Sequence, residues 1–468
     1  MPQRAHRRLR RNRLIAAVVA GVLVAVPAGA TSLHDGSGRH GAAAEVARSG
    51  WSSPAQLSPC PALGAARAVF PSDSPSHGTG AGAIVFSASV GCPGGPGARV
   101  AALHAGDTPG GPRAPRETSG RQIAPRGSLL ASGAPLGSIL IAGSRPAVPS
   151  EELVIQGPAA GPFSVLHREP GAARAIARGY LGDVALASAS SEQSISVQLE
   201  RFFKTGLAAP IRTAPAGSAA PAPPTLALDY RTDMLALWPA HGVLYARFLP
   251  THHAPAPVQR LAPIYPGAHV AALLSDDGRA IVAWSERRAG QESVYVDISG
   301  KGVRFNAPSL VDRFAVPDAL QNPGASPLLI RLSSEGVVMA WAGAEAARWA
   351  VHVAPVELSG VRPAATIASP GRDVLLEDVA PGPQGELLVL WGEPEAGPVG
   401  AAYPSRTALY AAPGLQAYPE RISFGEAEQV SSPEPAADAS VAIDPDSGRA
   451  LALWQGAKGR IDYSIRVP

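Results

Sequence analysis

Short apolar runs alternate with polar turns along most of the chain. One representative stretch contains an apolar run over 269–274, the acidic turn 275–278, a second apolar run ending at Trp284, and a third run over 293–298. Runs of this length, bounded by glycine and acidic residues, are typical of β-strands joined by tight turns. Because apolar and polar residues scarcely alternate within the runs, both faces of each strand are expected to be covered. The pattern predicts an all-β protein.

The same unit recurs, most clearly where an apolar run ends in tryptophan. The tryptophans that end an apolar run, from Trp238 onward, are 46, 57, 50 and 63 residues apart, and Phe86, Ala142 and Ala187 take the equivalent place in earlier units. A period near 50 residues with several strands per unit indicates repeated sheets that bury their faces against one another. We predict a β-propeller of about eight four-stranded blades over residues 51–468, with seven blades as the alternative. The tryptophans predicted to be buried between blades are Trp238, Trp284, Trp341, Trp391 and Trp454.

In general pattern the chain resembles secreted bacterial β-propeller repeat proteins of the sialidase-like and YVTN-like kinds. The resemblance covers residues 51–468 and rests on the recurring apolar runs, acidic turns and tryptophans. It implies a propeller that acts outside the cytoplasm. No unit carries the Ser-x-Asp-x-Gly-x-Thr-Trp box of sialidases, because the acidic turn here lies one strand too early. Sialidase activity is therefore not implied.

The two ends of the chain predict how the ring closes. The third strand of the last unit, 461–467, runs straight to Pro468 and leaves no segment for an outermost strand. Residues 51–58 share the aromatic-proline-apolar spacing of an outer segment elsewhere, 305–311. We therefore predict that 51–58 pairs beside 461–467 as the outermost strand of the last blade. This pairing would cover an edge that otherwise invites aggregation.

The first 30 residues have the build of a secretory signal peptide. An arginine-rich start precedes an apolar run over 14–26 and the small residues 28–30. The apolar run is shorter than the roughly 20 residues that span a bilayer, so we expect cleavage rather than the alternative, a membrane anchor. The expected mature chain begins near Thr31, with residues 31–50 as a flexible linker. It is expected to be secreted or to lie in the cell envelope, with no stable membrane span.

The net charge and the cysteine content narrow the possible ligands and cross-links. The formal charge of +3 and the pI near 9.0 reflect six arginines within the predicted signal peptide, and without them the charge becomes −3. A nucleic-acid ligand is therefore not expected. Apolar residues make up 46% of the chain, enough for a globular core. Only Cys60 and Cys92 are present, and in an exported chain they predict one disulfide, with free thiols or a metal site as alternatives.

Two stretches could hold a metal. Residues 444–448 place oxygens at alternate positions like the start of a calcium loop, and Asp276-Asp277-Gly278 is the same turn in another unit. The closing glutamate of a calcium loop is missing, so both are interpreted as hairpin turns. His252 and His253 lie in a proline-rich loop, where adjacent side chains point apart. No metal site and no cofactor are predicted.

Two charged stretches could serve a ligand or a reaction. Residues 286–288 (Glu-Arg-Arg) could contact an anion, and Glu393 with Glu395 could supply the paired carboxylates of glycoside hydrolysis. A solvated turn and an exposed acidic loop are the simpler interpretations. The chain has no His-Glu-x-x-His, no Gly-x-Ser-x-Gly, no phosphate-binding loop and no Cys-x-x-Cys.

The sequence therefore favours a monomeric, non-catalytic propeller that binds a protein or a polysaccharide. No catalytic residue is assigned, since fold alone does not fix function. The alternative is a carbohydrate-active hydrolase or lyase with its site at the central channel. A cluster of carboxylates with raised pKa values in the channel would favour the enzyme, whereas a channel lined by apolar and small side chains would favour the binding module.

Overall fold

The computed structural model describes residues 50–467 with internal gaps. The predicted signal peptide and nearly all of the predicted linker lie outside the described residues. Apart from two single 3₁₀ turns, η1 (Pro383–Gly385) and η2 (Ala457–Gly459), the described regular elements are β-strands. No helix in this part of the chain is long and apolar enough to cross a membrane. The residues not described are 1–49, 71–81, 104–108, 124, 126–128, 135–137, 145–150, 171, 180–182, 190–194, 201–210, 213–223, 266–267, 276, 301–303, 318–323, 333–335, 396–405, 418–420, 446 and 468.

The described strands form eight antiparallel sheets, called blades 1 to 8 in chain order. In blades 1 to 7 the innermost strand comes first in the chain, whereas blade 8 takes its outermost strand, β1, from the N-terminal side. Blade 1 contains β2 (Arg67–Val69), β3 (Ala83–Ala88) and β4 (Gly97–Ala102); blade 2 contains β5 (Leu129–Ala134), β6 (Ser138–Ser144), β7 (Glu151–Gly157) and β8 (Ser164–Pro170); blade 3 contains β9 (Ala172–Arg178), β10 (Val184–Ala189), β11 (Ile195–Glu200) and β12 (Ile211–Arg212); blade 4 contains β13 (Thr225–Leu228), β14 (Met234–Ala240), β15 (Val243–Leu249) and β16 (Gln259–Pro263).

Among blades 5 to 8, blades 5 to 7 contain the longest described strands. Blade 5 contains β17 (Val270–Leu274), β18 (Ala280–Arg288), β19 (Gln291–Ile298) and β20 (Ser309–Ala315); blade 6 contains β21 (Leu328–Arg331), β22 (Val337–Glu345), β23 (Arg348–Glu357), β24 (Gly360–Val361) and β25 (Ala365–Ile367); blade 7 contains β26 (Leu375–Pro381), β27 (Glu386–Pro394), β28 (Thr407–Ala417), β29 (Arg421–Phe424) and β30 (Glu428–Gln429); blade 8 contains β31 (Ala437–Ile443), β32 (Ala450–Gln455), β33 (Ile461–Arg466) and β1 (Ala55–Ser58).

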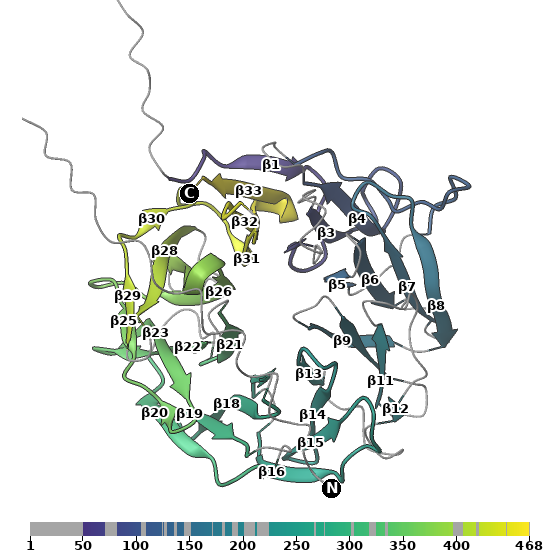
Figure 1. Cartoon of the computed structure of the whole chain (residues 1–468). Coiled ribbons are helices and arrows are strands. Elements are labelled where there is room, and N and C mark those ends of the chain that lie inside the picture. The colour runs from purple at the N-terminus through teal and green to yellow at the C-terminus, as the bar shows by residue number, and fades with distance from the viewer. Residues whose placement is uncertain are drawn as a thin grey trace, which may run out of the picture. The chain divides into compact units, whose positions relative to one another are not determined.

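The blades of this unit are arranged in a closed ring (Figure 1). Each innermost strand contacts the innermost strand of the next blade, in the order β2, β5, β9, β13, β17, β21, β26, β31 and back to β2. Stacked in this way, each sheet buries both faces against its neighbours, as the apolar composition of the strands requires. The predicted propeller with eight blades is confirmed. Blade 1 departs from four strands: within the described residues the edge of β4 carries an isolated bridge between Val100 and Arg113, and single backbone hydrogen bonds from Ala98 to the carbonyl of Pro125 and from Gly110 to the carbonyl of Ala102, but no fourth strand.

The N-terminal strand completes blade 8, as predicted. In the antiparallel ladder Ala55 lies opposite Tyr463, and a bridge joins Trp51 to Arg466. Ser52 adds a local network: its N–H donates to the Ile465 carbonyl (2.8 Å), its Oγ accepts from the Ile465 N–H (3.1 Å), and its carbonyl accepts from a neighbouring serine hydroxyl. The two ends of the described chain are therefore joined within one sheet.

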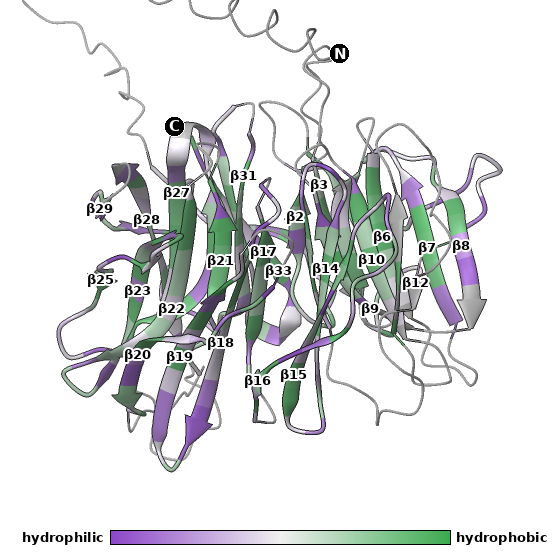
Figure 2. Cartoon of the chain, turned by 60° about the horizontal axis from the view of Figure 1, so that its bottom comes forward, coloured by the Kyte–Doolittle hydropathy of each residue, from purple (hydrophilic) through white to green (hydrophobic). Residues whose placement is uncertain are grey.

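The core lies between the blades rather than within a single sheet. Apolar side chains fill the middle of the strands, whereas polar residues gather at ends such as the β18–β19 turn (Figure 2). The repeated tryptophans lie on the second strand of their blades and are at most 3% exposed. Pro239 does not end its strand, because β14 continues to Ala240. A ring on the third strand stacks on four of these indoles, with centroids 5.4–6.0 Å apart: Tyr245 on Trp238, Tyr295 on Trp284, His352 on Trp341 and Tyr410 on Trp391.

Candidate functional site

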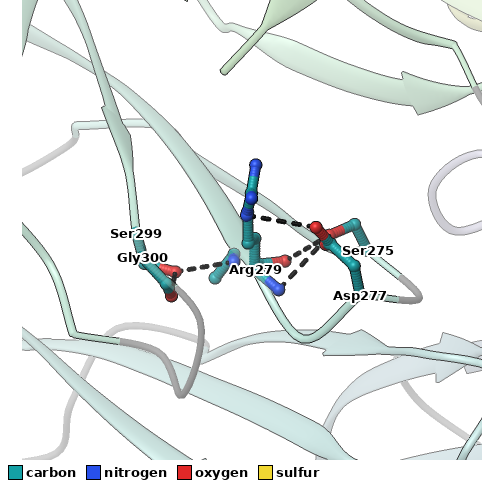
Figure 3. Close-up of polar contacts among 6 residues, drawn as sticks. Ser275, Asp277, Arg279, Ser299 and Gly300 are labelled. Carbon is teal, nitrogen blue, oxygen red and sulfur yellow. Dashed lines mark hydrogen bonds and ion pairs between the residues drawn. The ribbon is translucent and has the colours of Figure 1, made fainter. Parts of the chain in front are cut away.

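The acidic turn that marks the repeat is a self-contained hairpin in blade 5 (Figure 3). The Ser275 hydroxyl donates to Asp277 Oδ1 (2.6 Å) and accepts the N–H of Arg279, whose side chain pairs with Asp277 Oδ2 at 3.1 Å. The hydroxyl of Ser299, at the end of the third strand, accepts the N–H of Ala280 (2.8 Å). The described oxygens of this turn are thus occupied by the hairpin itself, which agrees with the structural interpretation. Asp276 lies outside the described residues.

The equivalent turn in blade 8 behaves in the same way. The Ser447 hydroxyl donates to Asp444 Oδ2 at 2.5 Å, and the N–H of Gly448 donates to the carbonyl of Asp444. Across the described residues no group of three or more histidine, cysteine, aspartate or glutamate side chains could hold a metal ion. His252 and His253 are exposed in the β15–β16 loop.

The acidic residues that follow the tryptophans have a structural use. The Trp284 indole N–H donates to Glu286 Oε1 (3.2 Å), and the Trp391 indole N–H donates to Glu393 Oε1 (3.5 Å). The Glu393 side chain is only 12% exposed, so the expected exposed acidic loop is wrong for this residue. Glu395, two residues on, is 40% exposed and pairs with Arg406 at 3.7 Å. The two glutamates therefore lie in different surroundings, Glu393 against an indole and Arg372, and Glu395 against Arg406.

Blade 6 keeps the indole contact by a different route. Glycine replaces the acid two residues after Trp341, and the indole N–H instead donates to Asp312 Oδ2 of blade 5 (2.9 Å). A Cβ at Gly343 would lie 2.3 Å from the buried His352 ring and 3.1 Å from Asp312 Oδ2. The absence of a side chain is thus what admits the acid from the neighbouring blade.

A group of carboxylates that the sequence reasoning missed lies on the inner strands of blades 7 and 8. Glu377 and Asp378 are adjacent in β26, and Asp438 is in β31. Both strands carry a register irregularity at these residues: the ladder shifts between Leu376 and Asp378 in β26 and around Asp438 in β31. Asp438 also has φ of +50°, a conformation that few non-glycine residues adopt. Such irregularities redirect side chains and are over-represented beside active sites.

Asp378 holds three blades together. Its Oδ1 accepts the N–H of Val379 (2.9 Å), and its Oδ2 accepts the N–H of Val441 in blade 8 (3.0 Å). Arg67, in the first strand of blade 1, reaches to 3.8 Å from the same Oδ2. Burial raises the pKa of Asp378, and Arg67 with the two backbone donors opposes that rise. Because both oxygens already have partners, we interpret Asp378 as a structural tie across the closure of the ring.

Glu377 is the residue of this group best suited to chemistry. Burial raises the pKa of its carboxyl to about 7, against one N–H donor from Ala439, and the negative charges of Asp438 and Asp378 raise it further. The residue as a whole is partly exposed, although its carboxyl is desolvated. A carboxyl that gains and loses its proton near neutral pH can act as a general acid or base, or can donate a hydrogen bond to a ligand. The sequence signal was present in two adjacent acids inside an otherwise apolar strand, 375–380.

A third carboxyl with a raised pKa lies away from the inner strands. Asp297, at the end of β19 in blade 5, is 2% exposed. Its Oδ1 accepts the N–H of Asn306 at 3.3 Å, and its Oδ2 has no hydrogen-bond partner among the described residues. Burial raises its pKa from the ordinary 3.8 to about 6, against the two backbone donors of Asn306 and Ile298.

The two cysteines lie next to each other, although both are free thiols in this structure. Cys60 follows the closing strand β1 and is partly buried, and Cys92 is buried in the β3–β4 turn of blade 1. Both contact the same apolar cluster between blades 8 and 1. The predicted disulfide is not formed here and stays a prediction.

Comparison with known proteins yields likenesses of fold and none of sequence family. No protein-family profile matches the sequence, and no curated protein matches it. Among solved structures, the chain is similar to the BP39L lectin from Burkholderia pseudomallei, with 14% identity, a TM-score of 0.46, and 88% of this chain and 100% of that chain covered. It is also similar to an ulvan lyase of polysaccharide lyase family PL25, with 10% identity, a TM-score of 0.47, and coverage of 87% and 95%. A GH93 α-L-arabinofuranosidase of Fusarium graminearum matches with 14% identity, a TM-score of 0.38, and coverage of 66% and 98%. At these identities and TM-scores the likenesses do not bear on the activity of this chain.

Proposed function

We propose that this protein is a binding propeller of the cell exterior or envelope, and that it takes a polysaccharide at the inner strands of blades 7, 8 and 1. The observation that carries the proposal is the placement of Glu377 and Asp438 on strand irregularities of two neighbouring inner strands, with Arg67 of blade 1 paired to the adjacent Asp378. Carboxylates accept hydrogen bonds from sugar hydroxyls, and a guanidinium donates them. The group therefore offers both acceptors and donors to a hydroxyl-rich ligand.

The raised pKa of Glu377 supports a functional role for this residue over a purely structural one. A carboxyl whose pKa is raised to about 7 destabilises the folded chain once it is ionised. Asp378 compensates for its burial with two backbone donors and Arg67, whereas Glu377 has one backbone donor. Strongly perturbed groups of this kind concentrate at functional sites.

The test is a panel of neutral and acidic polysaccharides, screened for binding and for turnover with the protein starting at Thr31. At least one polysaccharide is expected to bind, and Glu377→Gln and Asp438→Asn are expected to weaken that binding about tenfold or more. Glu395→Gln is the matched control, because this carboxylate is exposed and lies outside the inner strands. Binding unaffected by both inner-strand variants, or no binding across the panel, would refute the proposal.

The second candidate is a carbohydrate hydrolase or lyase at the same place, and the pKa of Glu377 near 7 is the observation that favours it. In that case Glu377 exchanges a proton with the substrate. Glu377→Gln should then abolish turnover while retaining most of the binding, and the pH profile of turnover should show a group near pH 7. If polysaccharides bind but none is turned over, the enzyme is refuted and the non-catalytic binding propeller stands.

A further inference from the structure

The segment that leads from β1 to β2 crosses the junction between blade 8 and blade 1. On the side of blade 8, the N–H of Ala62 donates to the carbonyl of Gly459 (2.8 Å), and the side chain of Gln455 donates to the carbonyls of Ala62 (3.1 Å) and Gly64 (3.0 Å). On the side of blade 1, the N–H of Leu63 donates to the carbonyl of Ser87 (2.8 Å). This crossing segment, residues 59–66, therefore belongs to both blades at the point where the ring closes.

The cysteine pair lies at this crossing. The thiol of Cys92 donates to the carbonyl of Pro61 (3.8 Å), the residue after Cys60, and the N–H of Ser89 donates to the same carbonyl (2.9 Å). The N–H of Cys60 is held by the hydroxyl of Ser58, at the end of β1 (3.2 Å). Backbone contacts on both sides thus keep the two thiols adjacent before any bond forms between them.

We infer that Cys60 and Cys92 form a thiol-disulfide latch that fixes the closing strand β1 to the ring. In the first step the Cys60 thiolate attacks one sulfur of a small disulfide such as oxidised glutathione, which releases one thiol and leaves a mixed disulfide on Cys60. The Cys92 thiolate then attacks the Cys60 sulfur and releases the second thiol. Two protein thiols are oxidised to one disulfide, and one external disulfide is reduced to two thiols.

The latch matters because β1 is short and lies at the edge of its sheet. The strand has four residues, and its ladder with β33 is irregular between Gln56 and Ser58. With free thiols, the crossing segment can detach together with β1. With Cys60 bonded to Cys92, a detached β1 stays within two residues of an anchored point. Its effective concentration at the edge of β33 therefore remains high, and the detached strand pairs with β33 again before it can move away from the ring.

The surroundings of the thiols set how fast the latch responds. Burial raises the pKa of Cys60, and the hydrogen bond and charge of Cys92 raise it further, while Ser58 and Arg99 oppose the rise. The reactive thiolate is therefore scarce at neutral pH, and exchange should accelerate in alkaline solution. Cys60 is the more exposed of the two and is the sulfur that meets the external disulfide first.

The experiment compares the chain starting at Thr31 after treatment with oxidised glutathione and after full reduction. Peptide mapping without reduction should show a Cys60–Cys92 cross-link, with the loss of two hydrogen atoms, in the oxidised sample alone. Amide hydrogen exchange should then show β1 and its partner β33 opening less often in the oxidised sample. The expected factor is on the order of 100, which is what a typical disulfide supplies. Blade 4, distant from the latch in the sheet order, is the internal reference and should not change.

Cys92→Ser is the matched variant, and its exchange at β1 should not respond to oxidation. If that variant does not fold, the comparison of oxidised and reduced wild-type protein stands by itself. Two free thiols after prolonged oxidation would overturn the inference. A cross-link that leaves the exchange of β1 and β33 unchanged would overturn it equally.

Discussion

Replacing Asp297 by asparagine should remove a destabilisation of blade 5 that grows as pH rises. Asparagine has nearly the same shape, and its amide oxygen can still accept the N–H that Asn306 donates to Asp297 Oδ1. The wild-type carboxyl is 2% exposed, and its pKa is about 6 in the folded chain against an ordinary 3.8. That difference of about two pKa units corresponds to roughly 3 kcal/mol.

Stability falls with rising pH because the folded chain holds the proton of Asp297 more tightly than the unfolded chain does. Below about pH 4 the carboxyl is protonated in both the folded and the unfolded chain, and it carries no penalty. Between about pH 4 and 6 the folded chain holds the proton while the unfolded chain has lost it, so stability falls as pH rises. Above about pH 6 the full penalty is present. Asp297→Asn should therefore match wild type at pH 4 and exceed it by up to about 3 kcal/mol at pH 8.

Urea unfolding of the two proteins at several pH values between 4 and 8 measures this difference directly. Glu426→Gln is the control, since this carboxylate is exposed and its replacement removes a surface carboxyl without touching the core. A free-energy difference between Asp297→Asn and wild type that stays constant from pH 4 to pH 8 would show that the folded chain does not hold this proton. If the wild type instead became increasingly more stable than Asp297→Asn as pH rises, the direction of the pKa shift would be wrong.

Three further predictions concern packing and export. Trp284→Ala should lower the free energy of unfolding by about 3–5 kcal/mol, because this indole is 1% exposed between blades 4 and 5, and an unchanged thermal midpoint would contradict that role. Gly343→Ala should cost about 1–3 kcal/mol as the new methyl meets the His352 ring, whereas Gly300→Ala, with open space around it, should cost less in the same urea titration. N-terminal sequencing of exported protein should find a start near Thr31, and an intact Met1 in a membrane fraction would refute cleavage.

The architecture could be predicted because apolar runs and turns recur periodically along the sequence. Apolar runs ending in Trp284, Trp341 and Trp391 mark the second strands, and strand periodicity needs only local sequence. Ring closure could be predicted because the last unit is one strand short, and a segment of matching composition stands at the other end. Both arguments rely on counting within repeats, which a single sequence allows.

The carboxylate group could not be predicted, because it depends on which blades become neighbours. Glu377 and Asp438 are far apart in sequence, and the strand irregularities that redirect them leave no periodic signature. The structural use of Glu393 was missed for a related reason: a glutamate two residues after a tryptophan resembles an exposed turn until the indole N–H is seen to point at it. Side-chain partners across strands are a property of the assembled sheets.

The pairing of β1 with β33 also dictates an order of assembly. Ser52 and Ser464 share a hydrogen bond although 412 residues separate them. Of the described strands, β1 precedes all the others in the chain yet pairs with the last, so blade 8 stays incomplete until β33 has emerged. Contacts at such separations form slowly, because the intervening chain must be gathered before they gain anything. A chain that stops short of β33 leaves β1 unpaired and the edge of the last blade uncovered, and such exposed edges promote aggregation.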